Sequence, residues 1–288
     1  MRIVTAQAGG GTDFVSRLIA LGLTDALKQP VIVDNRSGNV SVAAEAVARA
    51  APDGHTLLIY AATIWVAPLL QSTPYDPLRD FAPMTLATTA PNMLVVHPSL
   101  PVKSVSELIT LAKAKPGMLN YGGSTSGSTT HLAVELFKAL ARVDMLRVPY
   151  KGQGSMFGAL MAGEVQLTIT SGAALSPHVK AGRMRALGVT GARPSAMFPG
   201  LPAVAASLPG YESETLFAVF APAATPPAIV NHLQQEIARV LGRPDVKDRC
   251  FAAGNEVVAS TPQHLAAVMK ADMARMSKVI KDAGIRGE

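Results

Sequence analysis

The chain has 288 residues, of which 49% are hydrophobic and 16% are charged, and its formal net charge is +6. A chain of this length and composition can bury a large core in one large or two medium domains, which excludes a disordered protein. Its basic residues form no block of five or six, so the positive charge favours a small anionic ligand and argues against a nucleic-acid-binding stripe.

Three further features limit the class of protein. Cys250 is the single cysteine, which excludes an internal disulfide and a zinc site built from cysteines. The longest apolar run, residues 56–70, contains Pro68 and is shorter than the ~20 residues that a membrane-spanning helix needs. The chain begins directly on a predicted strand, so we expect that an export signal has been removed or is not included.

The first 27 residues predict a strand, a glycine turn and a helix. Residues 2–6 are apolar and β-branched, as in a short buried strand, and Gly9, Gly10 and Gly11 form the turn. Apolar residues at helical spacing, including Leu18 and Leu21, follow the turn. Free backbone N–H groups and the positive end of the helix dipole meet at such a turn, which makes it a seat for a small anion.

Two nucleotide-binding motifs do not fit this turn. A Walker-type phosphate loop needs a lysine after its last glycine, and Thr12 and Asp13 stand there instead. A dinucleotide fingerprint that starts at Gly9 meets Phe14 in place of its third glycine. The alternative without a ligand is an ordinary tight turn, in which Thr12 or Asp13 caps the helix.

The chain continues as alternating strands and helices, a pattern typical of an α/β sheet. We predict strands over residues 31–33 and 56–60 and a helix over 42–51. Thr63 and Trp65 lie in the predicted loop after the second of these strands, at the carboxyl end where open α/β sheets bind ligands. For Trp65, packing beneath the loop is an equal alternative to stacking on a ligand.

A second unit with the same organisation follows. Ser104 and Glu107 have the spacing of a capping box for a helix over 104–115, and a strand over 119–122 leads into the sequence GGSTSGSTTH. The hydroxyls of this stretch precede a helix predicted over 131–141. Together with backbone N–H groups they suit a carboxylate or sulfate ligand, whereas helix capping would explain only one or two of them.

The remaining segments complete two α/β units and a helical C-terminal part. Further strands are predicted over residues 93–96, 146–149, 165–170, 187–190 and 217–221. Further helices are predicted over residues 156–162, 227–241, 245–253 and 263–283.

The sequence offers no recognisable catalytic motif. It contains neither GxSxG nor HExxH. His131 and Glu135 share a helix face, but two ligands without a third favour a surface hydrogen bond over a metal site. We therefore expect a protein without catalytic residues, metal or cofactor.

Several segments resemble, in the same order, those of Bug-type solute receptors, the TctC-like extracytoplasmic binding proteins of the tripartite tricarboxylate transporter family. The matching segments are AGGGTDFVSRLIA, PVIVDNR, AEAVARAAPDGHTLL, PYDPLRDFAP, LVVHPSLPVKSVSELI, LNYGG, THLAVELF, VPYKGQG and APAATPPAIV. Together they extend over essentially the whole chain.

The resemblance implies an α/β fold of two domains, the type II periplasmic-binding-protein fold, with a ligand cleft between the domains. We expect residues 1–98 and 218–288 to form domain 1 and residues 99–217 to form domain 2. The resemblance also implies a monomeric periplasmic receptor that closes on a small organic carboxylate, delivers it to transporter subunits in the membrane and catalyses nothing. An enzyme or a ligand-sensing protein on the same scaffold is the alternative.

Carried over by position, the family's first binding loop falls on residues 5–10 and its second on residues 122–129. We expect the ligand to be bound by Ala6, Gln7, Gly9, Gly10, Thr63, Trp65, Ser124, Thr125, Ser128, Thr129, Thr170 and Ser171. The family commonly has an acid where this chain has Thr170 and Ser171. We therefore predict a preference for ligands whose second end is a carboxylate, a hydroxyl or an apolar body.

Overall fold

The computed structural model describes residues 1–38, 40–123, 128–150 and 152–285, and its contacts divide the chain into two compact units. Unit 1 comprises Met1–Thr89 and Leu216–Arg275, and unit 2 comprises Ala90–Thr215 with the residues from Met276 onward. The expected domain limits at residues 98 and 217 stay a prediction.

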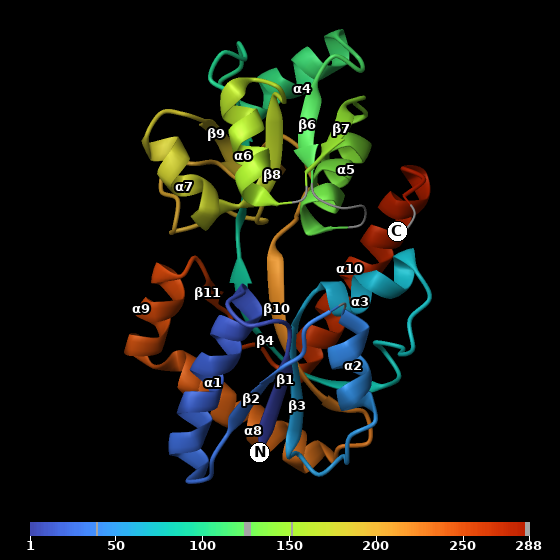
Figure 1. Ribbon diagram of the computed structural model, residues 1–288, viewed down its shortest axis with the longest axis vertical. Helices are drawn as coiled ribbons and strands as arrows, with labels where there is room; N and C mark the ends of the chain where they lie inside the picture. Colours follow the sequence, from blue (N-terminus) through green and yellow to red (C-terminus); the bar gives the residue numbers. More distant parts are fainter. Residues whose placement is uncertain (39, 124–127, 151, 286–288) are drawn as a thin grey trace. The chain divides into compact units, whose positions relative to one another are not determined.

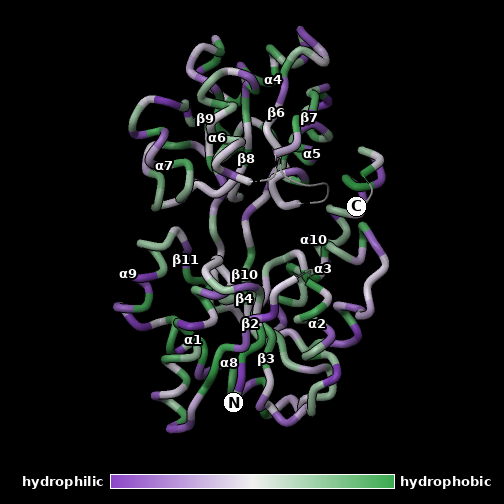
Figure 2. The backbone as a smooth tube through the Cα atoms, in the orientation of Figure 1, coloured by the Kyte–Doolittle hydropathy of each residue, from purple (hydrophilic) through white to green (hydrophobic). Residues whose placement is uncertain are grey.

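Unit 1 is built on a mixed sheet with the strand order β11-β4-β10-β3-β1-β2. Its strands are β1 (Arg2–Thr5), β2 (Ile32–Asn35), β3 (Thr56–Ala61), β4 (Phe81–Ala90), β10 (Thr215–Pro222) and β11 (Glu256–Val257). The strand β1 pairs in parallel with β2 and β3, so that Ile3 lies opposite both Val33 and Leu57. Residues 56–60 of β3 are all buried, and the tube in Figure 2 is mainly green, the colour of hydrophobic residues, along this strand.

Helices cover both faces of this sheet. They are α1 (Gly11–Leu27), α2 (Val40–Ala48), α3 (Thr63–Leu70), α8 (Pro227–Gly242), α9 (Pro244–Ala252) and α10 (Pro262–Asp282). In the order β3-β1-β2, the connection from β1 to β2 crosses the sheet in one direction, and the connection from β2 to β3 crosses it in the opposite direction. Because both crossovers are right-handed, α1 and α2 lie on opposite faces of the sheet. Figure 1 shows this arrangement, with α1 on one side of the strands and α2 and α3 on the other.

The buried face of α1 differs in part from the predicted one. Leu18 is buried as expected, but Leu21 is 58% exposed. Val15, Ile19 and Gly22 are buried beside Leu18, and Gly22 lies directly against Val240 of α8. A residue without a side chain is therefore needed where these two helices cross most closely.

Unit 2 has a five-stranded sheet with the order β7-β6-β8-β5-β9. Its strands are β5 (Asn92–Val96), β6 (Asn120–Gly123), β7 (Leu146–Pro149), β8 (Leu167–Ser171) and β9 (Arg185–Val189). Its helices are α4 (Val105–Ala114), α5 (Thr129–Ala141), α6 (Gln153–Ala162), α7 (Gly172–Lys180) and the short 3-10 helix η1 (Val204–Ala206). The strand β6 pairs in parallel with β7 and β8, whereas β5 runs antiparallel to β8 and β9.

One part of the core of unit 2 is formed by the sheet with α6 and α7. Met93 and Val95 of β5 pack there with Phe157 and Leu160 of α6 and Leu175 of α7. The expected capping box at the start of α4 is partly confirmed, because the Glu107 N–H donates to Ser104 Oγ at 3.2 Å, while the Glu107 carboxylate accepts from the Lys103 N–H instead.

Three elements differ from the sequence-based prediction. Residues 63–70 and 172–180 were not predicted as helices, because each contains a proline, Pro68 or Pro177. Each proline stands at the sixth position, so only one main-chain hydrogen bond is lost before the helix ends. The strand β4 was also missed, since its buried threonines and Pro83 conceal an apolar pattern.

The structure gives no indication of a membrane-crossing segment. Within the described residues, every helix is too short or too polar to span a bilayer.

Candidate functional site

The first candidate site is the loop of residues 6–10, called here the first loop, which joins β1 to α1 at the carboxyl end of the sheet. Gly9 has φ of +85°, a conformation that favours glycine. Ala6 is half-buried, whereas Gln7, Gly9 and Gly10 are exposed. Most of the residues that we expected to bind a ligand in this loop are thus exposed, at the amino end of α1.

Asp13 fixes the shape of the first loop. One carboxylate oxygen accepts hydrogen bonds from the Gly9 N–H at 2.9 Å and from Arg17 Nε at 3.0 Å, and the other accepts from Asn35 Nδ2 at 2.9 Å. Asn35 Nδ2 also donates to the Ala6 carbonyl oxygen at 2.9 Å. Burial acts to raise the pKa of Asp13, but the bonds from Arg17, Gly9 and Asn35 outweigh it and lower the pKa.

The expected role of Asp13 as a helix cap needs a correction. Gly10 is the N-cap of α1 and makes no side-chain capping bond, while Asp13 reaches back to Gly9. Asn35 was missed by the sequence analysis, although it ends the strand next to β1 and so lies at the same sheet edge.

Gly11 is needed for packing beneath the first loop. A Cβ atom at this position would lie 2.8 Å from Cζ of Phe217, whose side chain is buried. The first turn of α1 can therefore approach β10 only because residue 11 is a glycine.

The two candidates after β3 occupy different positions from those expected. Thr63 begins α3 and is half-buried. Trp65 lies inside α3 with no exposed surface, its Nε1 donates to Asp272 at 2.8 Å, and its ring contacts Phe220 edge-on. The packing alternative therefore describes Trp65 better than ligand stacking does, because neither its ring face nor its N–H is accessible.

The second candidate site lies at the carboxyl end of the unit 2 sheet. The three parallel strands β6, β7 and β8 lead there into α5, α6 and α7, so three helix amino ends follow adjacent strands. The Tyr150 N–H, just after β7, donates to the Gly123 carbonyl oxygen at 2.8 Å and ties two of these turns together. Such an edge can offer several backbone donors to one anion.

The hydroxyls of this edge divide into two groups. Ser128 is the N-cap of α5 and accepts from the His131 N–H at 3.3 Å, and Ser171 is the N-cap of α7 and accepts from the Ala174 N–H at 3.4 Å. Thr129, the first residue of α5, is exposed and makes no side-chain hydrogen bond among the described residues. Ser124 and Thr125 lie outside the described residues.

Thr170 belongs to a small polar group that joins two helices to β8. Its Oγ1 accepts from Gln153 Nε2 at 3.1 Å and from Thr130 Oγ1 at 3.3 Å. Gln153 begins α6 and is exposed, so it adds an amide to the same edge. Thr130 is one of the hydroxyl residues of the stretch GGSTSGSTTH, whereas Gln153 was not predicted as a site residue. The sequence signal for Gln153 was the start of a helix after a parallel strand.

His131 and Glu135 form part of a buried polar cluster and not the expected surface hydrogen bond. The Glu135 carboxylate accepts from Tyr121 Oη at 2.6 Å and from Lys138 Nζ at 2.8 Å, and His131 Nε2 lies 3.9 Å from it. Burial and the bond to Glu135 raise the pKa of Tyr121. Arg147 of β7 approaches His131 Nδ1 at 3.3 Å. Among the described residues no group of three possible metal ligands occurs.

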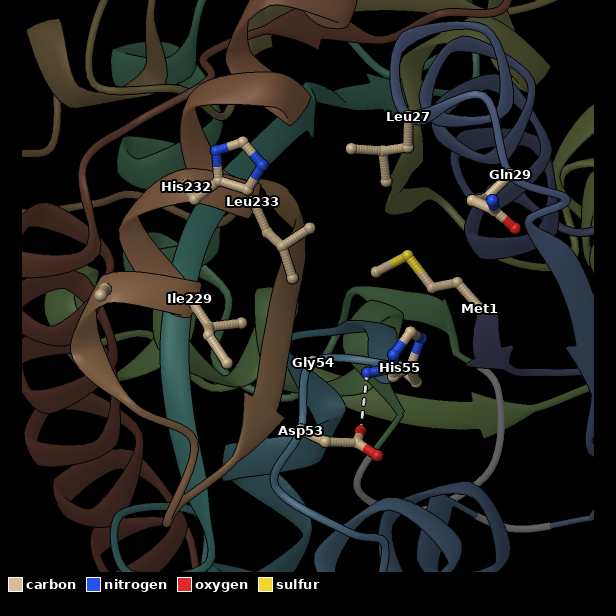
Figure 3. A pocket seen from close by; sticks show the side chains of 10 residues that line it. Met1, Leu27, Gln29, Asp53, Gly54, His55, Ile229, His232 and Leu233 are labelled. Atoms are coloured by element: carbon tan, nitrogen blue, oxygen red, sulfur yellow. Dashed lines mark hydrogen bonds between the residues drawn. The ribbon is translucent and has the colours of Figure 1, made fainter.

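A pocket of about 430 Å³ lies elsewhere in unit 1, at the amino ends of β1 and β3. Figure 3 shows Met1 and His55 on one side and Ile229 and His232 of α8 on the other. The first loop is at the carboxyl end of β1, so this pocket belongs to a different part of the unit. Its lining is mainly apolar, which does not suit a carboxylate.

Comparisons with known proteins agree on one family. A family model described as "Tripartite tricarboxylate transporter family receptor" matches residues 15–285. Protein BugT of Bordetella pertussis is 33% identical over 289 residues, which cover 99% of this chain and 89% of BugT.

Solved structures give the same result. A protein of R. palustris solved with adipate is 39% identical with a TM-score of 0.80, and the match covers 100% of this chain and 99% of that chain. MatC from Rhodopseudomonas palustris, solved with bound malate, is 30% identical with a TM-score of 0.76, over 97% of this chain and 99% of MatC. These matches confirm the predicted two-domain periplasmic-binding-protein fold and the predicted resemblance. The chain belongs to the family of tripartite tricarboxylate transporter receptors.

Proposed function

We propose that this protein captures a small organic carboxylate outside the cytoplasm and delivers it to the membrane subunits of a tripartite tricarboxylate-type transporter. The observation that carries the proposal is that each unit has a sheet edge with hydrogen-bond donors at a helix amino end, in a chain that is 39% identical to a protein solved with adipate. A receptor must meet its solute on the side from which transport begins, which is why we assign it to the periplasm.

The ligand that we propose is an aliphatic dicarboxylate. The groups that we propose as donors to its carboxylates are main-chain amides of the first loop in unit 1, and Thr129 with the amides at the start of α5 in unit 2. Adipate and malate, with which two relatives were solved, are both dicarboxylates. Helix amino ends bind such groups without a lysine or a metal ion.

We further propose that the protein catalyses no reaction. The residues that we expect to bind the ligand offer main-chain amides, hydroxyls and the side-chain amide of Gln7, which bind a carboxylate but make poor general acids or bases. Asp13 and Glu135, the acids nearest to them, are each engaged by two or more donors. A receptor needs only to release its ligand unchanged.

Calorimetry and thermal unfolding with one carboxylate panel test this function. Adipate, malate, succinate and glutarate should be titrated, and at a ligand concentration a thousandfold above Kd the stabilisation is about 4 kcal/mol, enough to raise Tm by several degrees. Incubation with the same compounds, followed by mass analysis, should return them unchanged. A protein that binds none of them, or that converts one, would not be the receptor proposed.

The pair Thr129→Val and Ser128→Ala assigns the hydroxyls within this site. Thr129→Val should leave Tm unchanged and weaken binding by roughly 1–3 kcal/mol, because a carboxylate loses a donor that makes no other bond among the described residues. Ser128→Ala should instead lower the stability of the unliganded protein by about 1 kcal/mol through loss of the α5 cap. Equal ligand affinity in the Thr129 variant and the wild type would remove Thr129 from the site.

A further inference from the structure

Arg147 lies beside the end of the strand that leads into the second loop, residues 122–129, of which 124–127 lie outside the described residues. In the paired strands β6 and β7, Arg147 stands opposite Tyr121. A Cβ atom added to Gly123 would lie 3.3 Å from Cγ and 3.4 Å from Cδ of Arg147. The stem of the arginine therefore passes close to Gly123, the residue that ends β6.

The guanidinium of Arg147 reaches the first turn of α5. Its Nη1 lies 3.3 Å from Nδ1 of His131. The main-chain N–H of His131 donates to Oγ of Ser128, the N-cap residue of α5. An arginine side chain can only donate, so Nδ1 is the acceptor and the ring proton of a neutral His131 is on Nε2. The positive group is thus held at the amino end of α5, beside the hydroxyl-bearing residues.

Arg147 keeps most of its bonding capacity. A guanidinium has five N–H donors, and the bond to His131 is the one hydrogen bond that it makes within the described part of the chain. No ion pair joins it to a carboxylate there, and the Glu135 carboxylate of the same polar cluster is bound by Tyr121 and Lys138. By contrast, Arg17 and Arg36 each form an ion pair with an aspartate.

We propose that Arg147 is a specificity-determining residue of the carboxylate site, where its charge favours a carboxylate over a neutral group of the same shape. The proposal rests on the proposed function. A half-buried cation without an anion gains from an incoming carboxylate, and a planar guanidinium with unused donors bonds such a group more strongly than a neutral hydroxyl does. The helix dipole of α5 acts in the same direction.

The test compares adipate with its neutral diamide, hexanediamide, in the wild type and in Arg147→Met. Loss of a charge-assisted bond should weaken adipate binding by roughly tenfold or more, while the affinity for the diamide changes by less than about threefold. Arg147→Lys keeps the charge but not the planar donors, so its affinity for adipate should lie between that of the wild type and that of Arg147→Met. Equal weakening of both ligands, or no weakening of adipate, would overturn the proposal and leave the receptor function standing.

Arg142→Met is the matched control. Arg142 is exposed at the C-cap of the same helix, about 20 Å from the first turn of α5, and its loss changes the net charge equally. This variant should bind adipate as the wild type does. If the wild type binds no carboxylate of the panel, the proposed function fails together with this inference.

An NMR measurement on the wild type covers the case in which Arg147→Met does not fold. The side-chain N–H signals of Arg147, assigned with the Arg147→Lys variant, should shift when adipate is added and stay in place with hexanediamide. If these signals do not shift on addition of adipate, under conditions where calorimetry shows binding, the proposed role of Arg147 is wrong.

Discussion

Asp13 follows the first loop by three residues, and its carboxylate is shared among Gly9, Arg17 and Asn35. The residue thereby connects the loop, the helix α1 and the neighbouring strand β2. These three bonds hold the first loop in place, and its residues Gln7 and Gly10 are exposed. Asp13 thus fixes the shape of the first loop, while its negative charge is buried and bound by three donors.

This arrangement makes stability depend on pH in a defined direction. Because the pKa of Asp13 is lowered in the folded protein, its contribution is complete above the unfolded value, near 4, and is lost as the pH falls through the lower folded value. We expect Asp13→Asn to cost about 1.5–3 kcal/mol at pH 7, the range for hydrogen bonds to a charged group.

Urea unfolding of the wild type and Asp13→Asn across the acidic range measures this dependence. The difference in the free energy of unfolding should be largest at neutral pH. It should shrink below pH ~4, where Asp13 binds a proton in the unfolded chain before it does so in the folded protein. If the difference in the free energy of unfolding between the two proteins does not change with pH, the negative charge of Asp13 does not contribute to stability.

At the scale of elements, most strands could be predicted because they are short, β-branched and bounded by turns. Residues 146–149 form a strand with the predicted limits, and the other predicted strands are displaced by one to a few residues. The helix α5 was predicted to begin at His131, but it begins at Thr129 with Ser128 as its cap. Hydroxyl residues can either cap a helix or continue a loop, so sequence alone could not separate the capping Ser128 from the available Thr129.

The network around the first loop could not be predicted for a different reason. The bonds from Asn35 to Ala6 and Asp13 join residues 22 or more positions apart, and they exist only because β1 and β2 pair in parallel. Likewise, the contact of Arg147 with Gly123 depends on the register of β6 against β7. Such side-chain pairs follow from strand pairing, which hydrophobic periodicity does not specify.

The contact between α1 and α8 allows a direct test of packing between elements. A Cβ atom at Gly22 would lie 2.6 Å from Cγ2 of Val240, which is buried. We expect Gly22→Ala to destabilise the protein by about 1–2 kcal/mol, because overpacking exceeds the gain of roughly 1 kcal/mol in helix propensity.

Two further variants make the packing test specific. Gly158→Ala lies in α6 with no atom within 4 Å of the added Cβ, so it should be neutral or stabilising. In Gly22→Ala combined with Val240→Ala, the two costs should be less than additive, as urea unfolding would measure. Strict additivity would show that the two helices do not meet at these residues.

At the scale of the whole molecule, two α/β units repeat one design, a parallel strand followed by a loop and a helix amino end. The repetition could be predicted, because each unit carries its own glycine-rich turn after an apolar strand. The limits of the domains at residues 98 and 217 stay a prediction. In the structure β4 ends, and β10 begins, within one residue of the limits of the compact units.

The distribution of charge in both units leads to a last prediction about the ligand. Asp13 is bound by Arg17, Asp34 by Arg36, and Glu135 by Lys138, so each of these acids near a candidate edge already has a cation. Thr170 and Ser171 offer only hydroxyls, and both accept hydrogen bonds from neighbouring residues. An ammonium group on a ligand would therefore lose its water without gaining a carboxylate, at a cost of several kcal/mol.

We therefore expect glutarate to bind more tightly than glutamate, and succinate more tightly than aspartate. Each pair differs only by the amino group, so calorimetry with the four compounds at one pH and salt concentration isolates the cost of the ammonium. The factor should exceed roughly tenfold, since 1.4 kcal/mol already corresponds to that ratio and the loss of hydration is larger. Tighter binding of either amino acid would mean that an acid outside those named here reaches the ligand, and the assignment to dicarboxylates would then be wrong.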